Sequence, residues 1–213
     1  MSIDVKICGL KDEASIDAAI DGGAAMIGFV FFSPSPRFVS VQRASELITR
    51  ASRQVICVGL VVDADDQWLD SVVDGAGINM LQLHGEETPE RVKYIRKKYR
   101  LPIIKSLPVQ EQGDVARAYS FENDVDYMMF DAKPPENAGR PGGNAKAFDW
   151  SLLSGNEFQF PWILAGGLTV ENISEAVKIS GAGVVDVSSG VEDTSGYKNI
   201  EKIHNFLAVS ATL

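Results

Sequence analysis

Two side chains with the chemistry of a base and an acid, Cys8 and Asp131, each end a short apolar run of the sequence. The runs, at 4–8 and 126–131, have the length and composition of buried strands. Lys6 shares a strand face with Cys8 because side chains alternate, and a neighbouring cation favours the thiolate. We also expect Lys6 to contact the substrate. From position alone, a small buried structural cysteine is an equal alternative. A long irregular segment follows Asp131, which favours a general acid over a helix N-cap.

Three further polar side chains stand near the ends of other apolar runs. Arg37 follows two prolines in 33–37, and its planar fork suits a carboxylate or a phosphate. A surface arginine in a turn is the alternative. Gln82 and His84 share one face of the run 79–84, which indicates substrate contacts inside a barrel mouth. A hydrogen-bonded polar layer of the core explains His84 at least as well.

Turns rich in glycine and serine follow the last two apolar runs. Glycines let the backbone approach an anion, and N–H groups at a helix start donate to it. These turns therefore predict a phosphate-binding pocket, with Gly166, Gly167, Ser188, Ser189 and Gly190 as its residues. Asp186 shares a strand face with the first of these serines. It is expected to point inward and either pair with Lys6 or contact the substrate, and a purely structural ion pair is the alternative.

The elements that must position these residues alternate along the whole chain. The apolar runs are nearly continuous, as in parallel strands that are buried on both faces. Strands are expected at 4–8, 25–32, 54–63, 79–84, 102–107, 126–131, 161–165 and 183–188. Amphipathic helices are expected at 11–22, 41–52, 65–76, 88–100, 112–121, 148–154, 170–180 and 197–209. Eight such units predict an α/β protein with a single-domain (β/α)8 TIM barrel over residues 1–213, and a doubly wound open sheet is the alternative.

Local signals refine this outline. Thr88 followed by Pro89 predicts a helix start, and Gly181 predicts a helix end. The long irregular segment 132–147 is interpreted as a lid or binding loop. The segment 192–196 leaves room for a short extra helical turn beside the phosphate pocket.

Composition narrows the class of function. The 213 residues carry 20 basic and 29 acidic side chains, a formal charge of −9, which disfavours a nucleic-acid partner. No apolar run approaches the roughly 20 residues of a membrane span, and no signal peptide opens the chain. The two cysteines form no metal-binding spacing, and Cys57 is interpreted as structural. We therefore expect a cytoplasmic monomer without metal, cofactor, nucleic-acid or membrane partner, acting on a small phosphorylated molecule.

The sequence also resembles one enzyme family, the phosphoribosylanthranilate isomerases. The resemblance covers nearly the whole chain, in order and at the expected strand ends. The matching segments are KICGL at 6–10, GFVFFSPSPRFVS at 28–40, LQLHGEE at 81–87, the aspartate at 131, FDW at 148–150, LAGGLTVENI at 164–173 and VDVSSGVE at 185–192. The KICG start together with the SSGVE ending is distinctive, because other phosphate-binding barrels share only the glycine turns.

The resemblance implies an Amadori rearrangement in tryptophan biosynthesis. Asp131 matches the family's acid, which protonates the ribose ring oxygen, and Cys8 matches its base, which takes the proton from the second carbon of the sugar. Arg37 matches an arginine at the anthranilate end, where it would bind the carboxylate and help keep the thiol ionised. The glycine and serine turns match the phosphate site. No cofactor is implied.

The sequence departs from the family pattern in one segment, and two other functions are alternatives to the isomerase. Asn144-Ala145 follows Gly142-Gly143 where the family commonly has Ser or Thr and then Gly, and the prolines of 134–141 are interpreted as a lineage-specific lid. An aminoaldose isomerase of histidine synthesis would use aspartates on strands 1 and 5, where this chain has Cys8 and Ser106. A catalytically silent barrel that only binds a phosphometabolite is the other alternative.

Overall fold

Eight parallel strands close into a barrel, each hydrogen-bonded to the next and the last to the first. The computed structural model describes residues 3–51, 54–134, 142 and 147–213. The strands are β1 Asp4–Cys8, β2 Met26–Val30, β3 Ile56–Val61, β4 Met80–Leu83, β5 Ile103–Val109, β6 Tyr127–Ala132, β7 Trp162–Leu164 and β8 Val184–Val187. The predicted barrel is confirmed, and the alternative of an open sheet is excluded.

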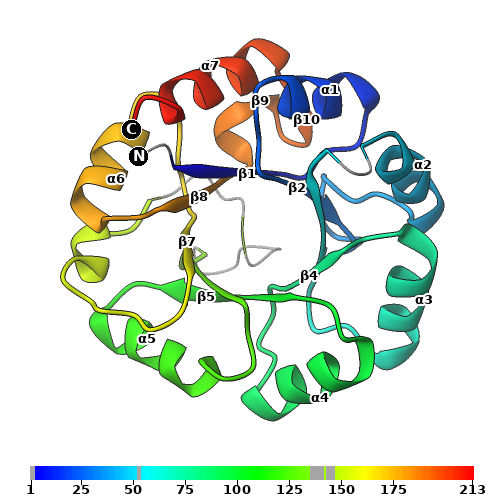
Figure 1. Cartoon of the computed structure of the whole chain (residues 1–213), viewed down its shortest axis with the longest axis horizontal. Coiled ribbons are helices and arrows are strands. Elements are labelled where there is room, and N and C mark those ends of the chain that lie inside the picture. The colour runs from blue at the N-terminus through cyan, green and yellow to red at the C-terminus, as the bar shows by residue number, and fades with distance from the viewer. Residues whose placement is uncertain (1–2, 52–53, 135–141, 143–146) are drawn as a thin grey trace.

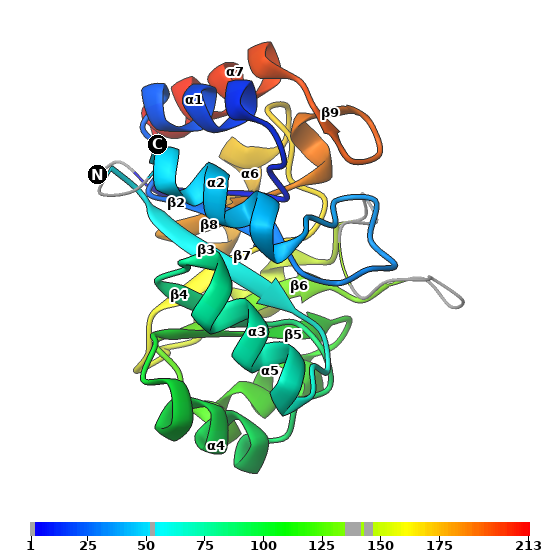
Figure 2. The ribbon, with the colours of Figure 1, turned by 90° about the vertical axis from the view of Figure 1, so that its right-hand side faces the viewer.

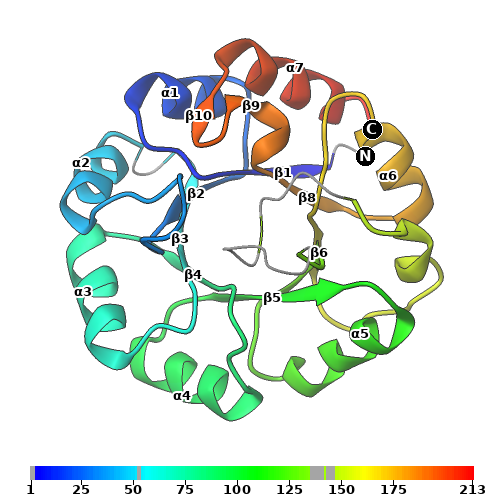
Figure 3. The same ribbon diagram turned by 180° about the vertical axis from the view of Figure 1, so that it is seen from behind.

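Helices form an outer ring around the barrel (Figure 1). They are α1 Glu13–Asp21, α2 Val41–Ala51, α3 Asp66–Ala76, α4 Pro89–Tyr99, α5 Gln112–Ala116, α6 Ile173–Ser180 and α7 Ile200–Ser210, with 3₁₀ helices η1 Arg117–Phe121, η2 Trp150–Leu153 and η3 Ser189–Val191. The last helix, α7, packs against α1, which brings the two ends of the chain together (Figures 1 and 3). Among the described residues, no helix has the length and apolarity to cross a membrane.

The period-two alternation of the strands divides the barrel interior into layers. One layer is an apolar plug of inward-facing side chains, namely Met26, Val58, Met80, Ile104, Met129, Ile163 and Ala165. Cys8, Val30 and Leu60 form a separate small apolar cluster nearer the carboxyl ends of their strands. Because the plug fills the interior, chemistry is confined to the end of the barrel where the strands finish.

Helix ends follow the local signals of the sequence. The Thr88 hydroxyl accepts a hydrogen bond from the Arg91 N–H at 3.3 Å, and Pro89 opens α4. Gly181 ends α6 in the left-handed conformation, with φ of 76°, which only glycine adopts without strain. Both predictions are confirmed.

Three segments that were predicted to be helical have a different structure. The segment 112–121 is a short α-helix followed by η1. The segment 148–154 contains only η2, because Ser154 is extended and Gly155 is left-handed. The aromatic side chains of Phe130, Phe158 and Trp162 pack together beside it. The expected helical turn in 192–196 is wrong. That segment belongs to a hairpin of β9 Glu192–Thr194 and β10 Tyr197–Lys198, and the last helix begins only at Ile200.

The hairpin projects from the same end of the barrel as the loop that follows β2 (Figure 2). Its turn contains Gly196, with φ of 87°, where a Cβ atom would lie 2.4 Å from the Pro36 carbonyl oxygen. Glycine therefore allows the hairpin turn to lie directly against the loop after β2. This contact brings Glu192 and Lys198 beside Arg37, 155 residues earlier in the chain than Glu192.

Candidate active site

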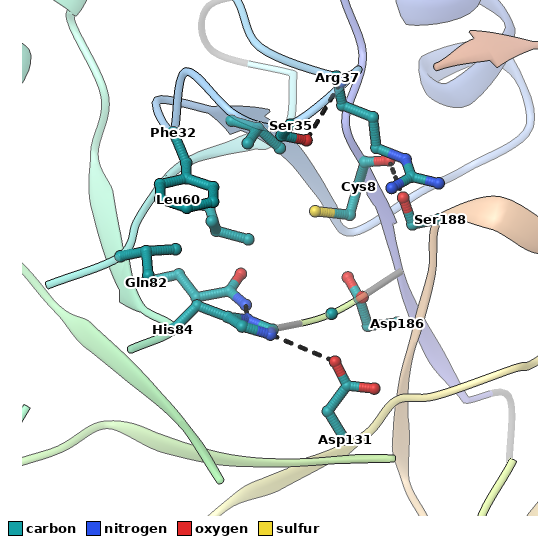
Figure 4. A pocket seen from close by; sticks show the side chains of 13 residues that line it. Cys8, Phe32, Ser35, Arg37, Leu60, Gln82, His84, Asp131, Asp186 and Ser188 are labelled. Atoms are coloured by element: carbon teal, nitrogen blue, oxygen red, sulfur yellow. Dashed lines mark hydrogen bonds and ion pairs between the residues drawn. The ribbon is translucent and has the colours of Figure 1, made fainter. Parts of the chain in front are cut away.

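A cavity of about 470 Å³ opens at the carboxyl end of the barrel. Seven of the predicted site residues line it, namely Cys8, Arg37, Gln82, His84, Asp131, Asp186 and Ser188. They come from five different strands or the loops that follow them, and Figure 4 shows them around one space. Lys6, which was expected to contact the substrate, is fully buried and is not among the residues that line the cavity.

Cys8 stands beside a buried ion pair. The Lys6 ammonium lies 2.7 Å from Asp186 Oδ1, across the register that pairs β1 with β8. A Cβ atom at Gly28 would lie 3.0 Å from Cys8 Sγ and 3.1 Å from Lys6 Nζ, so glycine at this position leaves room for both groups. Burial lowers the pKa of Lys6, but Asp186 and Cys8 together outweigh it and hold that pKa above its usual range.

The protonation of Cys8 differs from the sequence-based expectation. Burial raises the pKa of the Cys8 thiol above its ordinary value, and Lys6 opposes this only in part. The negative charge of Asp186, which neutralises Lys6, also raises it. A cation two residues away is therefore present, as predicted, but its partner weakens its effect on the thiol. Cys57 is buried in β3 as expected, and burial raises the pKa of its thiol to about 11.

Asp131 faces the same cavity from β6. Its Oδ1 accepts a hydrogen bond from the Ala132 N–H at 2.8 Å, and its Oδ2 lies 3.3 Å from His84 Nε2. Gly166 has a φ of 89°, and a Cβ atom there would lie 2.9 Å from Asp131 Oδ1. A Cβ atom on Gly142 would lie 2.8 Å from Asp131 Oδ2 and 2.6 Å from His84 Nε2. Two glycines thus let the backbone come close to the carboxyl group on both sides.

Gln82 and His84 form a short polar relay toward Asp131 (Figure 4). Gln82 Nε2 donates to His84 Nδ1 at 2.9 Å and to Ser106 Oγ at 3.0 Å. His84 Nδ1 is then an acceptor, so its Nε2 carries the hydrogen that faces Asp131. Gln82 is fully buried, and its Oε1 has no hydrogen-bond partner among the described residues. A buried acceptor without a partner is costly, so a ligand hydrogen is the expected complement.

Arg37 does not present a free fork. Its Nε and Nη2 donate to the two carboxylate oxygens of Glu192 at 2.7 and 2.8 Å, in a bidentate pair. Lys198 Nζ lies 2.9 Å from Glu192 Oε1, the same oxygen that accepts from Arg37 Nε. Burial raises the pKa of Glu192, but Arg37 and Lys198 outweigh it and lower that pKa from 4.5 to about 2.

Sequence reasoning missed both Glu192 and Lys198. The matched segment SSGVE contains Glu192, but no pattern in the sequence connects it to Arg37. The Ser195-Gly196 turn was a usable signal, because it lies between these two charged residues and predicts a hairpin. Such a hairpin places their side chains next to one another.

The predicted phosphate turns pack directly against each other. A Cβ atom on Gly190 would lie 1.9 Å from the Leu168 carbonyl oxygen, so only glycine permits the contact. A second cavity, of about 670 Å³, lies at these turns. Its lining residues are Gly167, Leu168, Thr169, Val170, Glu171, Ser189, Gly190, Glu192 and Lys202. Lys202, on α7, is a cation that the sequence did not place there.

Two further predictions concern the lid segment and the absence of a metal site. The Asn144-Ala145 departure and most of the expected lid at 134–141 lie outside the described residues. Within the part of the chain that the structure describes, no group of three or more His, Cys, Asp or Glu side chains could hold a metal ion.

Comparison with known proteins gives one consistent result. A family model described as N-(5'phosphoribosyl)anthranilate (PRA) isomerase matches residues 5–209. The N-(5'-phosphoribosyl)anthranilate isomerase of Paramagnetospirillum magneticum is 52% identical over 207 residues, 97% of this chain and 96% of that protein. The phosphoribosyl anthranilate isomerase of Thermotoga maritima has a TM-score of 0.88 at 32% identity, covering 99% of this chain and 100% of that one. A phosphoribosyl anthranilate isomerase in complex with reduced 1-(o-carboxyphenylamino)-1-deoxyribulose 5-phosphate has a TM-score of 0.86 at 30% identity, with the same coverage.

Proposed function

The chain belongs to the N-(5'-phosphoribosyl)anthranilate isomerase family, and from that premise we infer the reaction and propose the side chains that perform it. The protein converts N-(5-phosphoribosyl)anthranilate to 1-(2-carboxyphenylamino)-1-deoxyribulose 5-phosphate in tryptophan biosynthesis. This Amadori rearrangement turns an aminoaldose into an aminoketose. Its bond changes are balanced by proton transfers alone, so the chemistry needs an acid and a base on the two sides of the sugar.

Asp131 is the acid in this proposal. Its carboxyl proton passes to the ribose ring oxygen, the bond from that oxygen to C1 breaks, and the nitrogen lone pair forms a C=N bond. The Ala132 N–H fixes Oδ1 by a hydrogen bond, and His84 Nε2 lies 3.3 Å from Oδ2. The same donors stabilise the carboxylate that remains after the proton has left.

Cys8 is the base. Its thiolate takes the proton from C2, the C–H electron pair forms a C1=C2 bond, and the C=N pair returns to nitrogen. The resulting enolamine gives up its hydroxyl proton and gains a proton at C1, which yields the ketone. Lys6 acts through Cys8 and Asp186 rather than by touching the substrate, because it lies buried beside both.

The remaining lining residues bind the two ends of the substrate. Arg37 receives the anthranilate carboxylate on Nη1, which the described residues leave without a partner. The unpartnered Oε1 of Gln82 accepts a hydrogen from a sugar hydroxyl or the amine, and Asp186 accepts from a second hydroxyl. The phosphate binds at the turns after β7 and β8, where Gly167, Ser189 and Gly190 line the second cavity. Gly166 and Ser188 belong to the same two turns, and Ser188 lines the first cavity.

One observation carries this assignment: a thiol on β1 and a carboxyl on β6 face the same cavity from different sides (Figure 4). The test generates phosphoribosylanthranilate in situ from anthranilate and follows the loss of its fluorescence, with a chelator present. Wild-type protein should give rapid loss. The loss should vanish in Asp131→Ala and fall steeply in Cys8→Ala. Turnover at the wild-type rate in both variants would contradict the assignment.

We also propose that the protein works as a monomer in the cytoplasm. Both cysteines are free thiols, which a reducing compartment preserves, and the net charge of −9 opposes self-association. Light scattering coupled to size-exclusion chromatography should give the mass of one chain. A mass of two chains would overturn the monomer, and recovery of the protein outside the cytoplasmic fraction would overturn the location.

A further inference from the structure

The hairpin after β8 delivers two buried charges of opposite sign to the edge of the active site. The side chains of Glu192 and Lys198 are only 4% and 1% exposed. Glu192 uses both carboxylate oxygens to hold Arg37, which lines the substrate cavity. Lys198 binds Oε1 as well, at 2.9 Å, so two cations share the carboxylate.

Lys198 also holds the strand ends that flank the thiol. Its Nζ donates to the Ser188 carbonyl oxygen at 2.9 Å and contacts Ser188 Oγ at 3.3 Å. Ser188 Oγ in turn donates to the Cys8 carbonyl oxygen at 3.0 Å, a bond seen in Figure 4. A single ammonium group therefore joins the hairpin, the end of β8 and the end of β1.

The charges around the thiol are unequal in number. The ionisable groups that face it are Lys6 from β1, Asp186 from β8, Lys198 from β10, Arg37 from the loop after β2, and His84 and Asp131 across the cavity. Lys6 and Asp186 neutralise each other as a pair. The second group contains two cations, Arg37 and Lys198, and one carboxylate, Glu192, so its net charge is +1. Because Glu192 neutralises Arg37, we assign the remaining positive charge to Lys198. Lys198 lowers the pKa of Cys8, in opposition to burial.

We propose that Lys198 is a positioning residue of this isomerase: its buried ammonium aligns Arg37 through Glu192 and leaves one net positive charge beside the Cys8 thiol. This positive charge has two electrostatic effects during one turnover. It favours the thiolate that removes the C2 proton, and it compensates the substrate carboxylate that arrives at Arg37. The inference rests on the roles proposed for Cys8 and Arg37, and it adds a residue that touches neither the substrate nor the reacting atoms.

The test uses the full chain with Cys57→Ala, so that Cys8 is the single thiol. The pH dependence of alkylation by iodoacetamide gives the midpoint of Cys8 ionisation. Lys198→Met should move this midpoint up by about one pH unit, so that alkylation at neutral pH slows about tenfold. Lys198→Arg keeps the charge and should restore the wild-type midpoint.

A double variant separates the charge from the alignment. Lys198→Met combined with Glu192→Gln again leaves one positive charge, on Arg37. Its alkylation midpoint should return to the wild-type value. Its KM should be about tenfold above that of wild type, because the guanidinium has lost its bidentate carboxylate partner.

Lys105→Met is the matched control for removing a buried ammonium. Lys105 is 1% exposed and pairs at 2.9 Å with Glu87, away from the cavity lining. It should lose stability like Lys198→Met but leave the alkylation midpoint unchanged. A wild-type midpoint in Lys198→Met, or the same upward shift in Lys105→Met, would overturn the inference. If Cys8→Ala keeps full turnover, the role of Cys8 as base fails, while the alkylation midpoints still report whether Lys198 acts on the thiol.

Discussion

Glu192→Gln gives a quantitative test of the charge cluster that holds Arg37. Arg37 and Lys198 lower the pKa of the buried carboxyl from 4.5 to about 2, although burial alone would raise it. At about 1.4 kcal/mol per pH unit, this difference corresponds to about 3 kcal/mol of folding free energy. A carboxyl whose folded pKa is depressed contributes its full stability above the unfolded pKa. The contribution is lost as the pH falls from about 4.5 to about 2.

The assay is urea unfolding, followed by circular dichroism, at pH 7, 5, 4 and 3. The free energy of unfolding should be about 3 kcal/mol lower in Glu192→Gln than in wild type at pH 7, and the difference should shrink steadily below pH 4.5. Glu46→Gln is the control, because Glu46 forms an ion pair with Arg43 on the surface of α2. Exposed pairs contribute little, so this variant should stay close to wild type at every pH. A difference for Glu192→Gln that does not change between pH 7 and pH 3 would refute the reasoning.

Three further predictions concern the glycines and the histidine of the site. Gly28→Ala places a Cβ atom 3.0 Å from the thiol sulfur and 3.1 Å from the buried ammonium beside it, and kcat should fall about tenfold or more with little change in KM. In Gly190→Ala the new Cβ atom would lie 1.9 Å from a backbone oxygen, so inorganic phosphate should inhibit this variant more weakly than wild type. In the control Gly183→Ala the Cβ atom meets nothing within 4 Å, and phosphate should inhibit this variant as it inhibits wild type. His84→Gln keeps a donor toward Asp131 and should retain more of the wild-type kcat than His84→Ala, as initial rates would show. Equal rates in the two histidine variants, or unchanged behaviour in either of the first two glycine variants, would count against the site geometry.

The sequence determined the barrel and much of its active end because both follow from simple periodicities. Alternation with period two places Cys8 and Lys6 on one face of β1, and Gln82 and His84 on one face of β4. Eight apolar runs of strand length then bring these faces to one interior. The shared position of Cys8 and Asp131 at strand ends was enough to predict a common cavity, which the structure contains.

The features that sequence reasoning missed depend on contacts between distant segments. The partner of Arg37 is 155 residues away, on a hairpin whose position depends on the contact of Gly196 with the loop after β2. The direction of the Cys8 pKa shift also could not be predicted from Lys6 alone. It depends on the extent of burial and on Asp186, which neutralises that lysine.

The helical segment expected at 148–154 failed for a different reason. Its amphipathic pattern is real, but Gly155 takes a φ of 73° and Ser154 is extended, so the chain leaves the helical conformation after Trp150–Leu153. Phe158 and Trp162 then pack with Phe130 in a cluster beside this short turn.

The most direct test of the central claim is the fate of the hydrogen at C2 of the ribose. Substrate that carries deuterium at C2 would be turned over, and release of the label to solvent would be followed beside the loss of fluorescence. If Cys8 is the base and Asp131 the acid, wild type should slow with the heavy isotope and release the label. Cys8→Ala should release almost none, and Asp131→Ala should neither open the ring nor release it. Label release by Cys8→Ala at the wild-type rate would contradict the account.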